Sequence, residues 1–303
     1  HAQFRRQRQM CIRDRYKLYK NDNLPNKILL SGEKGIGKST LAYHFINFVL
    51  SENEEHPYDY ENNIINSDNK SYKLIQNKSN PNFHLIDVLE DKKNIDINQI
   101  RELIVNLNKS SFNKKKRFVL IDNIELLNLN SINALLKILE EPNENIIFIL
   151  INNNKRVLPT LKSRCLNFKV FLSNDQSIRI VNQLLNDDMN IIINDKLFDY
   201  YSTPGKLIKL IKLSQEYNLD LANFDLNTTL TTLIKDKIYK KDKSIIEIIY
   251  SFIELYFRNN ISSKNISLLK SYHYFLEKIN NTKIYNLDEE TLFMEFEDKI
   301  LNG

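Results

Sequence analysis

The segment Gly32–Ser39, GEKGIGKS, constrains this chain more than any other, because it fits the phosphate-binding pattern G-x-x-x-x-G-K-[ST]. Glycines let a backbone wrap around phosphate oxygens with its N–H groups pointing inward, and a helix that starts there adds its positive dipole end. A strand candidate, Lys27–Leu30, precedes the segment, and apolar residues at helical spacing follow it to about Ser51. Three of the chain's five glycines fall within it. These features predict a nucleotide-phosphate site formed by Gly32, Glu33, Lys34, Gly35, Ile36, Gly37, Lys38, Ser39 and Thr40.

The same pattern assigns roles to single side chains. Lys38 is expected to reach the β- and γ-phosphates, and Ser39 to offer its hydroxyl to Mg²⁺. Residues 118–122, FVLID, end in Asp122, which we expect to hold the same Mg²⁺ through water. Asn123 follows, and an amide cannot act as a general base. The sequence therefore predicts ATP or ADP with Mg²⁺ as ligands and weak or absent hydrolysis, with Glu125 left open as a substitute base.

Strand and helix patterns alternate over the first half of the chain. Residues 52–82 show no clear period and are interpreted as an irregular insertion. This alternation predicts an α/β architecture with a parallel sheet and helices on both faces. The strand candidates are Lys27–Leu30, Phe83–Val88, Phe118–Ile121, Ile146–Ile151 and Phe168–Phe171, and the helix candidates are residues 39–51, Ile97–Asn108 and Ser131–Glu141.

From Ser173 onward the strand pattern disappears. The polar stretch Asn218–Thr229 is interpreted as a boundary between two helical pieces. We therefore expect three domains, an α/β domain at about 16–171 and two helical ones at about 172–222 and 223–303. The helix candidates here are Ile178–Leu185, Lys206–Leu213, Ser244–Phe257, Ser267–Ile279 and Leu287–Ile300.

Composition narrows the possible classes of protein. No apolar run approaches the ~20 residues of a membrane span, so no membrane contact is expected. Two cysteines are too few for a disulfide framework or a four-cysteine zinc site. The net charge of +5 permits nucleic-acid contact without demanding it. A solvated loop is favoured over DNA contact for the basic cluster formed by Lys109, Lys114, Lys115, Lys116 and Arg117.

The first 15 residues are set apart from the fold. The run from Arg5 to Arg15 is strongly basic. It fits a transit peptide, a nucleic-acid-binding arm or a non-native extension, and the last of these is favoured.

Four further motifs carry a family resemblance. Residues 131–142, SINALLKILEEP, resemble the NALLKxLEEP signature of bacterial clamp-loader ATPases, and residues 158–165, LPTLKSRC, resemble their LPTxxSRC motif. Residues 100–103, IREL, and 286–288, NLD, resemble two shorter motifs of the family. Order and spacing match from about residue 24 to the end. The chain thus resembles the AAA+ subunits of the DNA polymerase III clamp loader, and the delta-prime type more than the gamma/tau type.

The resemblance implies a RecA-like AAA+ core at 16–171, a helical lid at 172–222 and a helical collar, used for oligomerisation, at 223–303. It also implies that Arg164 of the SRC motif acts in trans, as an arginine finger toward ATP bound by a neighbouring subunit. Asn152 matches the sensor 1 position, where an amide would orient the γ-phosphate or water. Lys206, in TPGK at 203–206, matches the sensor 2 region, where an arginine is common.

Two departures favour the delta-prime type. Residues 52–82 contain no cysteine, so no zinc is expected there, and no acidic residue directly follows Asp122. Gamma/tau subunits keep both a cysteine zinc module and an acidic residue after the metal-side Asp, and this chain has neither. An active gamma/tau-like ATPase that uses Glu125 stays open as the alternative. A free-standing P-loop enzyme, such as a nucleotide kinase, is disfavoured because it explains neither the SRC motif nor the helical second half.

The resemblance further implies partners. These are gamma/tau and delta subunits, the β sliding clamp in transient contact, and primer–template DNA held by the assembled complex, with Lys137 facing it. The expected location is the bacterial cytoplasm, in association with the nucleoid.

Overall fold

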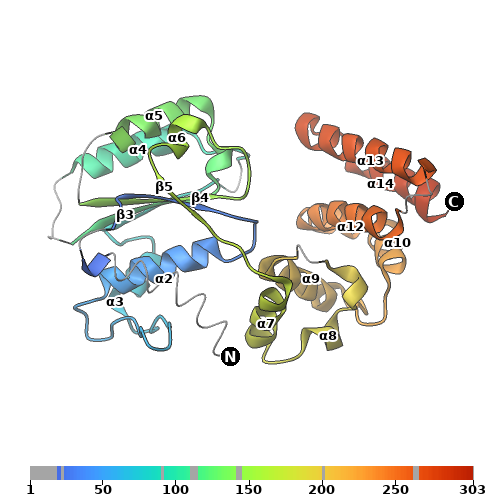
Figure 1. Ribbon diagram of the computed structural model, residues 1–303, viewed down its shortest axis with the longest axis horizontal. Coiled ribbons are helices and arrows are strands. Elements are labelled where there is room, and N and C mark those ends of the chain that lie inside the picture. Colours follow the sequence, from blue (N-terminus) through green and yellow to red (C-terminus); the bar gives the residue numbers. More distant parts are fainter. Residues whose placement is uncertain are drawn as a thin grey trace. The chain divides into compact units, whose positions relative to one another are not determined.

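The computed structural model describes residues 19–21, 24–89, 92–109, 115–140, 145–199, 202–261 and 266–302. The chain divides into two compact units, His1–Leu172 and Ser173–Gly303. The first combines a sheet with helices, whereas every regular element described in the second is helical (Figure 1). The predicted α/β architecture followed by a helical region is therefore confirmed.

A five-stranded parallel sheet forms the centre of the first unit. Its order is β2-β3-β4-β1-β5, so β1 lies between β4 and β5. Leu30 of β1 pairs with Ile151 of β4, and Ile121 of β3 pairs with Leu150 of β4, which brings their carboxyl ends to one edge. The strands are β1 (Lys27–Ser31), β2 (Phe83–Ile86), β3 (Arg117–Ile121), β4 (Ile146–Asn152) and β5 (Leu166–Lys169).

Helices cover both faces of this sheet, α4, α5 and α6 on one and α2 and α3 on the other (Figure 1). Side chains alternate accordingly along each strand. Val119 and Ile121 of β3 pack toward α4 and α5, whereas Leu120 packs toward α2. The helices are α2 (Lys38–Leu50), α3 (Lys70–Gln76), α4 (Ile97–Asn108), α5 (Leu129–Glu140) and α6 (Pro159–Lys162), with a 3₁₀ turn η1 (Ile124–Leu126) after β3.

Helix α3 corrects the interpretation of residues 52–82 as irregular throughout. Its sequence shows no apolar stripe, because only Ser71 and Ile75 are buried in it. Ile75 packs into the core beside α2, and polar contacts hold the rest of the helix. Asn69 caps it by accepting a hydrogen bond from the backbone N–H of Tyr72 at 2.7 Å. A short polar helix of this kind gives no amphipathic signal in the sequence.

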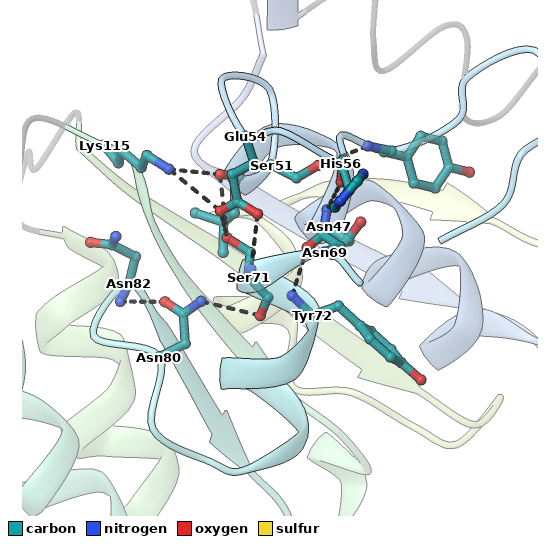
Figure 2. Close-up of polar contacts among 12 residues, drawn as sticks. Asn47, Ser51, Glu54, His56, Asn69, Ser71, Tyr72, Asn80, Asn82 and Lys115 are labelled. Carbon is teal, nitrogen blue, oxygen red and sulfur yellow. Dashed lines mark hydrogen bonds and ion pairs between the residues drawn. The ribbon is translucent and has the colours of Figure 1, made fainter. Parts of the chain in front are cut away.

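A polar cluster fixes α3 against the end of α2 (Figure 2). Ser71 donates its hydroxyl to Oε1 of Glu54 at 2.5 Å, and its backbone N–H donates to Oε2 of the same carboxylate at 3.0 Å. Lys115, just before β3, donates to the carbonyl of Leu50 at 2.9 Å. We call Asn69, Ser71, Glu54 and Lys115 the polar brace, since they join α2, α3 and the start of β3.

The fifth strand also differs from its prediction, lying two residues earlier than Phe168–Phe171. The backbone N–H of Val170 still donates to the carbonyl of Ser31 at 2.8 Å, but pairing ends there. Phe171 is 76% exposed. The prediction extended the strand to Phe171 because an aromatic residue is typical of a buried strand.

The helices of the second unit share one hydrophobic core. Its largest buried side chains are Phe257, Phe275, Phe293 and Phe296. The sequence did not predict α10, α8 or α11, which are short or begin in the polar boundary stretch, and the three-domain division stays a prediction. The elements are α7 (Asn174–Leu185), α8 (Met189–Ile192), η2 (Asp195–Leu197), α9 (Pro204–Tyr217), α10 (Leu226–Lys235), α11 (Ile238–Lys241), α12 (Ser244–Asn260), α13 (Ile266–Tyr285), α14 (Glu289–Phe296) and the π turn η3 (Glu297–Leu301).

In the described ranges, none of the helices combines the length and the apolar character needed to cross a membrane.

Candidate nucleotide site

The loop between β1 and α2 needs its glycines. Gly35 and Gly37 have φ values of 85° and 94°, in the left-handed region that side chains disfavour. A Cβ atom added to Gly32 would lie 2.3 Å from the carbonyl oxygen of Val170. The backbone N–H of Gly32 also donates to the carbonyl of Asn152 at 3.2 Å. The loop therefore has the backbone shape that the glycine spacing predicts.

Lys38 lies inside this loop and is only 3% exposed. Its Nζ donates to the carbonyl oxygens of Gly32, at 2.9 Å, and Glu33, at 2.7 Å. Burial lowers the pKa of Lys38, while the nearby charges of Asp122 and Glu125 act in the opposite direction. The ammonium group is thus held at the centre of the loop, where a phosphate would meet it.

Ser39 and Asp122 lie together at the carboxyl edge of the sheet. The Ser39 hydroxyl donates to Oδ2 of Asp122 at 2.6 Å. Burial raises the pKa of Asp122, and the Ser39 hydrogen bond opposes that rise. A hydroxyl beside a carboxylate, next to a phosphate loop, is a donor set that suits Mg²⁺ bound with a nucleotide. The described residues contain no group of three or more His, Cys, Asp or Glu side chains placed to hold a metal ion.

Two asparagines form hydrogen bonds to two further carboxylates at this edge. Asn123 donates Nδ2 to Oδ1 of Asp87, which follows β2, at 2.8 Å. Asn153 donates Nδ2 to Oε1 of Glu125 at 2.8 Å and to Oδ1 of Asn123 at 2.7 Å. We call Asn123 and Asn153 the amide clasp. The sequence reasoning singled out neither Asp87 nor Asn153, although Asp87 directly follows β2 and Asn153 directly follows the buried strand β4, and that position was the available signal.

The three consecutive asparagines Asn152, Asn153 and Asn154 have different hydrogen-bond partners. The side chain of Asn152 is buried and is engaged with Lys155, donating to its carbonyl at 3.0 Å and accepting from its N–H at 3.3 Å. Asn154 donates to Oε1 of Glu33, in the phosphate loop, at 2.6 Å. Asn153 alone of these three reaches the residues after β3. The sensor role of Asn152 stays a prediction.

Arg164 lies between α6 and β5 and does not contact the loop of its own chain. Its guanidinium donates to the carbonyl of Thr160 at 2.8 Å and pairs with the carboxylate of Glu140 on α5. Its side chain is 34% exposed, which leaves the group accessible. The remaining predicted residue, Lys206, lies exposed in the first turn of α9 in the helical unit, and its role stays a prediction.

The basic cluster before β3 differs in part from the expected solvated loop. Arg117 is buried and donates Nη1 to the carbonyl of Lys109 at 3.1 Å. Lys115 belongs to the polar brace. Lys114 lies outside the described residues.

A parallel sheet of this order, with a glycine-rich phosphate loop after β1 and an acid after β3, which β4 separates from β1, defines a P-loop core of the RecA-like AAA+ class. The family model described as "DNA polymerase III, delta subunit" matches residues 9–172. This stretch is more than half of the chain and contains the loop, Asp122 and Arg164. The chain belongs to that family.

Relatives at low to moderate identity agree with this assignment. Subunit delta' of DNA polymerase III from Pseudomonas aeruginosa is 32% identical over 138 residues, which are 45% of this chain and 40% of that relative. Subunit gamma from Buchnera aphidicola subsp. Schizaphis graminum is 30% identical over 45% of this chain and 39% of the relative. Subunit delta' from the same organism is 24% identical over 88% of this chain and 82% of the relative. The first two of these alignments, both at 30% identity or more, thus span about two fifths of each relative.

A gamma subunit-related protein of Thermotoga maritima is similar in structure. It has a TM-score of 0.48 and 18% identity, over 88% of this chain and 91% of that one.

Proposed function

We propose that this protein is a delta-prime-type subunit of the clamp loader of DNA polymerase III. The observation that carries this proposal is the single family match over 9–172, which contains the phosphate loop, the acid after β3 and the SRC arginine together. The proposed work of the subunit is assembly and allostery, with nucleotide bound and cleaved slowly or not at all.

Nucleotide binding follows from the geometry of the loop. Lys38 would exchange its two carbonyl partners for phosphate oxygens, and the backbone N–H groups of the loop would donate to the same anion. Ser39 and Asp122 would hold Mg²⁺, which neutralises charge on the phosphates when bound. Asn123 follows Asp122 where hydrolysing relatives have a glutamate, so the position next to the metal acid offers no base.

Arg164 would act on a neighbouring subunit. A guanidinium stabilises charge that develops on a γ-phosphate during its transfer. Because Arg164 is accessible and pairs with the exposed Glu140 of its own chain, it has to leave Glu140 to reach a neighbour's nucleotide. The proposed neighbours are gamma/tau and delta subunits, and the assembly would place the β sliding clamp on primed DNA, with Lys137 of α5 toward the DNA.

A second candidate is an active gamma/tau-like ATPase subunit. One observation favours it, since the charge of Glu125 acts on Lys38 and this carboxylate therefore lies near the phosphate loop. Relatives named gamma also occur among the matches.

A single-turnover experiment separates these candidates. The chain in excess is mixed with labelled ATP and Mg²⁺, and bound and cleaved nucleotide are measured in each sample. ATP that is bound and stays uncleaved over minutes supports the delta-prime proposal. Rapid cleavage by the chain alone supports the second candidate, and absence of bound nucleotide contradicts the proposed nucleotide site.

A further inference from the structure

The amide clasp contacts two carboxylates, Glu125 and Asp87, and Glu125 is the one left open above as a substitute base. We propose that Asn153 restrains Glu125 from acting as a general base, with Asn123 anchoring this restraint to Asp87. The proposal rests on the proposed function, since it explains why a site able to bind nucleotide would not cleave it. In the reaction so prevented, a carboxylate takes the proton of a water whose oxygen bonds to the γ-phosphorus, while the bond to the departing ADP oxygen breaks.

The hydrogen bonds fix both oxygens of Glu125. Asn153 donates its Nδ2 to Oε1 at 2.8 Å and its backbone N–H to Oε2 at 3.3 Å. A carboxylate held at both oxygens by one residue has a fixed direction, and it has to break these bonds to turn toward water. The carboxylate of Glu125 therefore lies near the site, but both of its oxygens accept hydrogen bonds from Asn153.

The clasp is itself anchored. The second hydrogen of Asn153 Nδ2 goes to Oδ1 of Asn123 at 2.7 Å, and Asn123 donates Nδ2 to Asp87 at 2.8 Å. The chain of contacts runs from β4 through β3 to β2, across three adjacent strands. All four side chains are half-buried, which limits competition from bulk water. Rotation of Asn153 alone would remove a donor from Glu125 and a donor from the amide oxygen of Asn123, so the clasp has one preferred arrangement.

Both carboxylates lie near the candidate nucleotide site. The charge of Glu125 opposes the lowering of the pKa of Lys38, and the charge of Asp87 adds to the raised pKa of Asp122. Each carboxylate therefore lies close to one of the groups expected to hold nucleotide or metal. Glu125 is therefore not too far from the site to act in catalysis. We infer that its hydrogen bonds to Asn153 are what restrain it.

The test compares four chains in the single-turnover experiment. Asn153→Ala is expected to cleave bound ATP at least tenfold faster than the original chain, and Asn153→Ala with Glu125→Gln is expected to return to the original rate. The matched control is Asn62→Ala, which breaks an exposed asparagine–aspartate pair with Asp59 and should leave the rate unchanged. Equal or slower cleavage by Asn153→Ala, with nucleotide still bound, overturns the proposal.

A second readout needs no nucleotide. Thermal unfolding of Asn153→Ser, Glu125→Gln and the double variant measures whether the two side chains are coupled. A double variant that loses less in Tm than the two single losses together supports the clasp, and additive losses overturn it. The outcomes are also distinct from those for the proposed function. If the original chain binds no ATP, the nucleotide site itself is wrong. If every variant binds ATP and none cleaves it faster, only the clasp is wrong.

Discussion

At the scale of single residues, the candidate site contains two opposite charges, Lys38 and Asp122, that are largely shielded from solvent. Burial lowers the pKa of Lys38 and raises that of Asp122, and each charge opposes the shift of the other. Hydrogen bonds from Lys38 to two carbonyls and from Ser39 to Asp122 compensate part of the desolvation. In the proposed function, a magnesium nucleotide would supply stronger partners to all three groups.

Replacing the buried lysine tests this arrangement. We expect Lys38→Met to lose about 1.5–3 kcal/mol of ATP binding free energy, the range for hydrogen bonds to charged groups. This corresponds to a roughly 10- to 150-fold higher Kd, which titration of a fluorescent ATP analogue measures. Lys73→Met, at an exposed lysine paired with Asp68, is the matched control and should bind normally. Equal affinity in both variants would remove Lys38 from the site.

Cys165 gives a prediction about pH. Burial raises the pKa of its thiol to about 11. The thiolate is the reactive form, so in a Cys11→Ser chain Cys165 should react with a disulfide reagent at pH 8 at least about tenfold more slowly than a free thiol. Because the native thiol stays protonated where the unfolded one ionises, this group should also lower stability as pH rises from 9 toward 11. A reaction as fast as that of a free thiol contradicts the burial.

Residue roles were predictable only where spacing alone specifies them. The phosphate loop and Asp122 follow from a motif in which each position has one chemical task. Asp87 and Asn153 were missed because an isolated acid or amide after a strand has many possible roles. What distinguishes them is the pairing of adjacent strand ends, and that pairing depends on the order of strands in the sheet.

At the scale of elements, α4 and β4 were predicted to within one residue. Helix α4 begins at Asp96, whose side chain caps it together with Gln99, and its apolar residues recur at helical spacing. Strand β4 is a continuous apolar run buried on both faces. Helix α3 was missed because Ile75 is its single buried apolar residue and the polar brace supplies further contacts.

The polar brace makes a stability prediction. Ser71→Ala removes the hydroxyl bond to Glu54 and leaves a partly buried carboxylate with one donor fewer, so it should cost about 1–3 kcal/mol of unfolding free energy. Urea unfolding measures the change. Ser79→Ala, at an exposed serine in the same segment, should stay within about 0.5 kcal/mol. Equal effects of the two variants would show that the brace does not stabilise this segment.

At the scale of the whole molecule, the two units differ in what they contain. The first carries the nucleotide loop and Arg164, and the second packs its helices around one aromatic-rich core. The change from alternating strands and helices to helices alone was predictable, because the two patterns have different periods. Contacts with other subunits depend on surfaces, whose side chains follow no comparable period.

The most direct test is reconstitution with gamma/tau and delta subunits encoded by the same genome, followed by clamp loading and ATPase measurements on primed DNA. Arg164→Ala should preserve assembly but lower the ATPase rate by about 10³-fold or more, because the guanidinium stabilises transferred charge. Arg179→Ala, at an exposed arginine of α7, is the control and should leave the rate unchanged. A complex that forms with Arg164→Ala and hydrolyses ATP at the original rate would contradict the account.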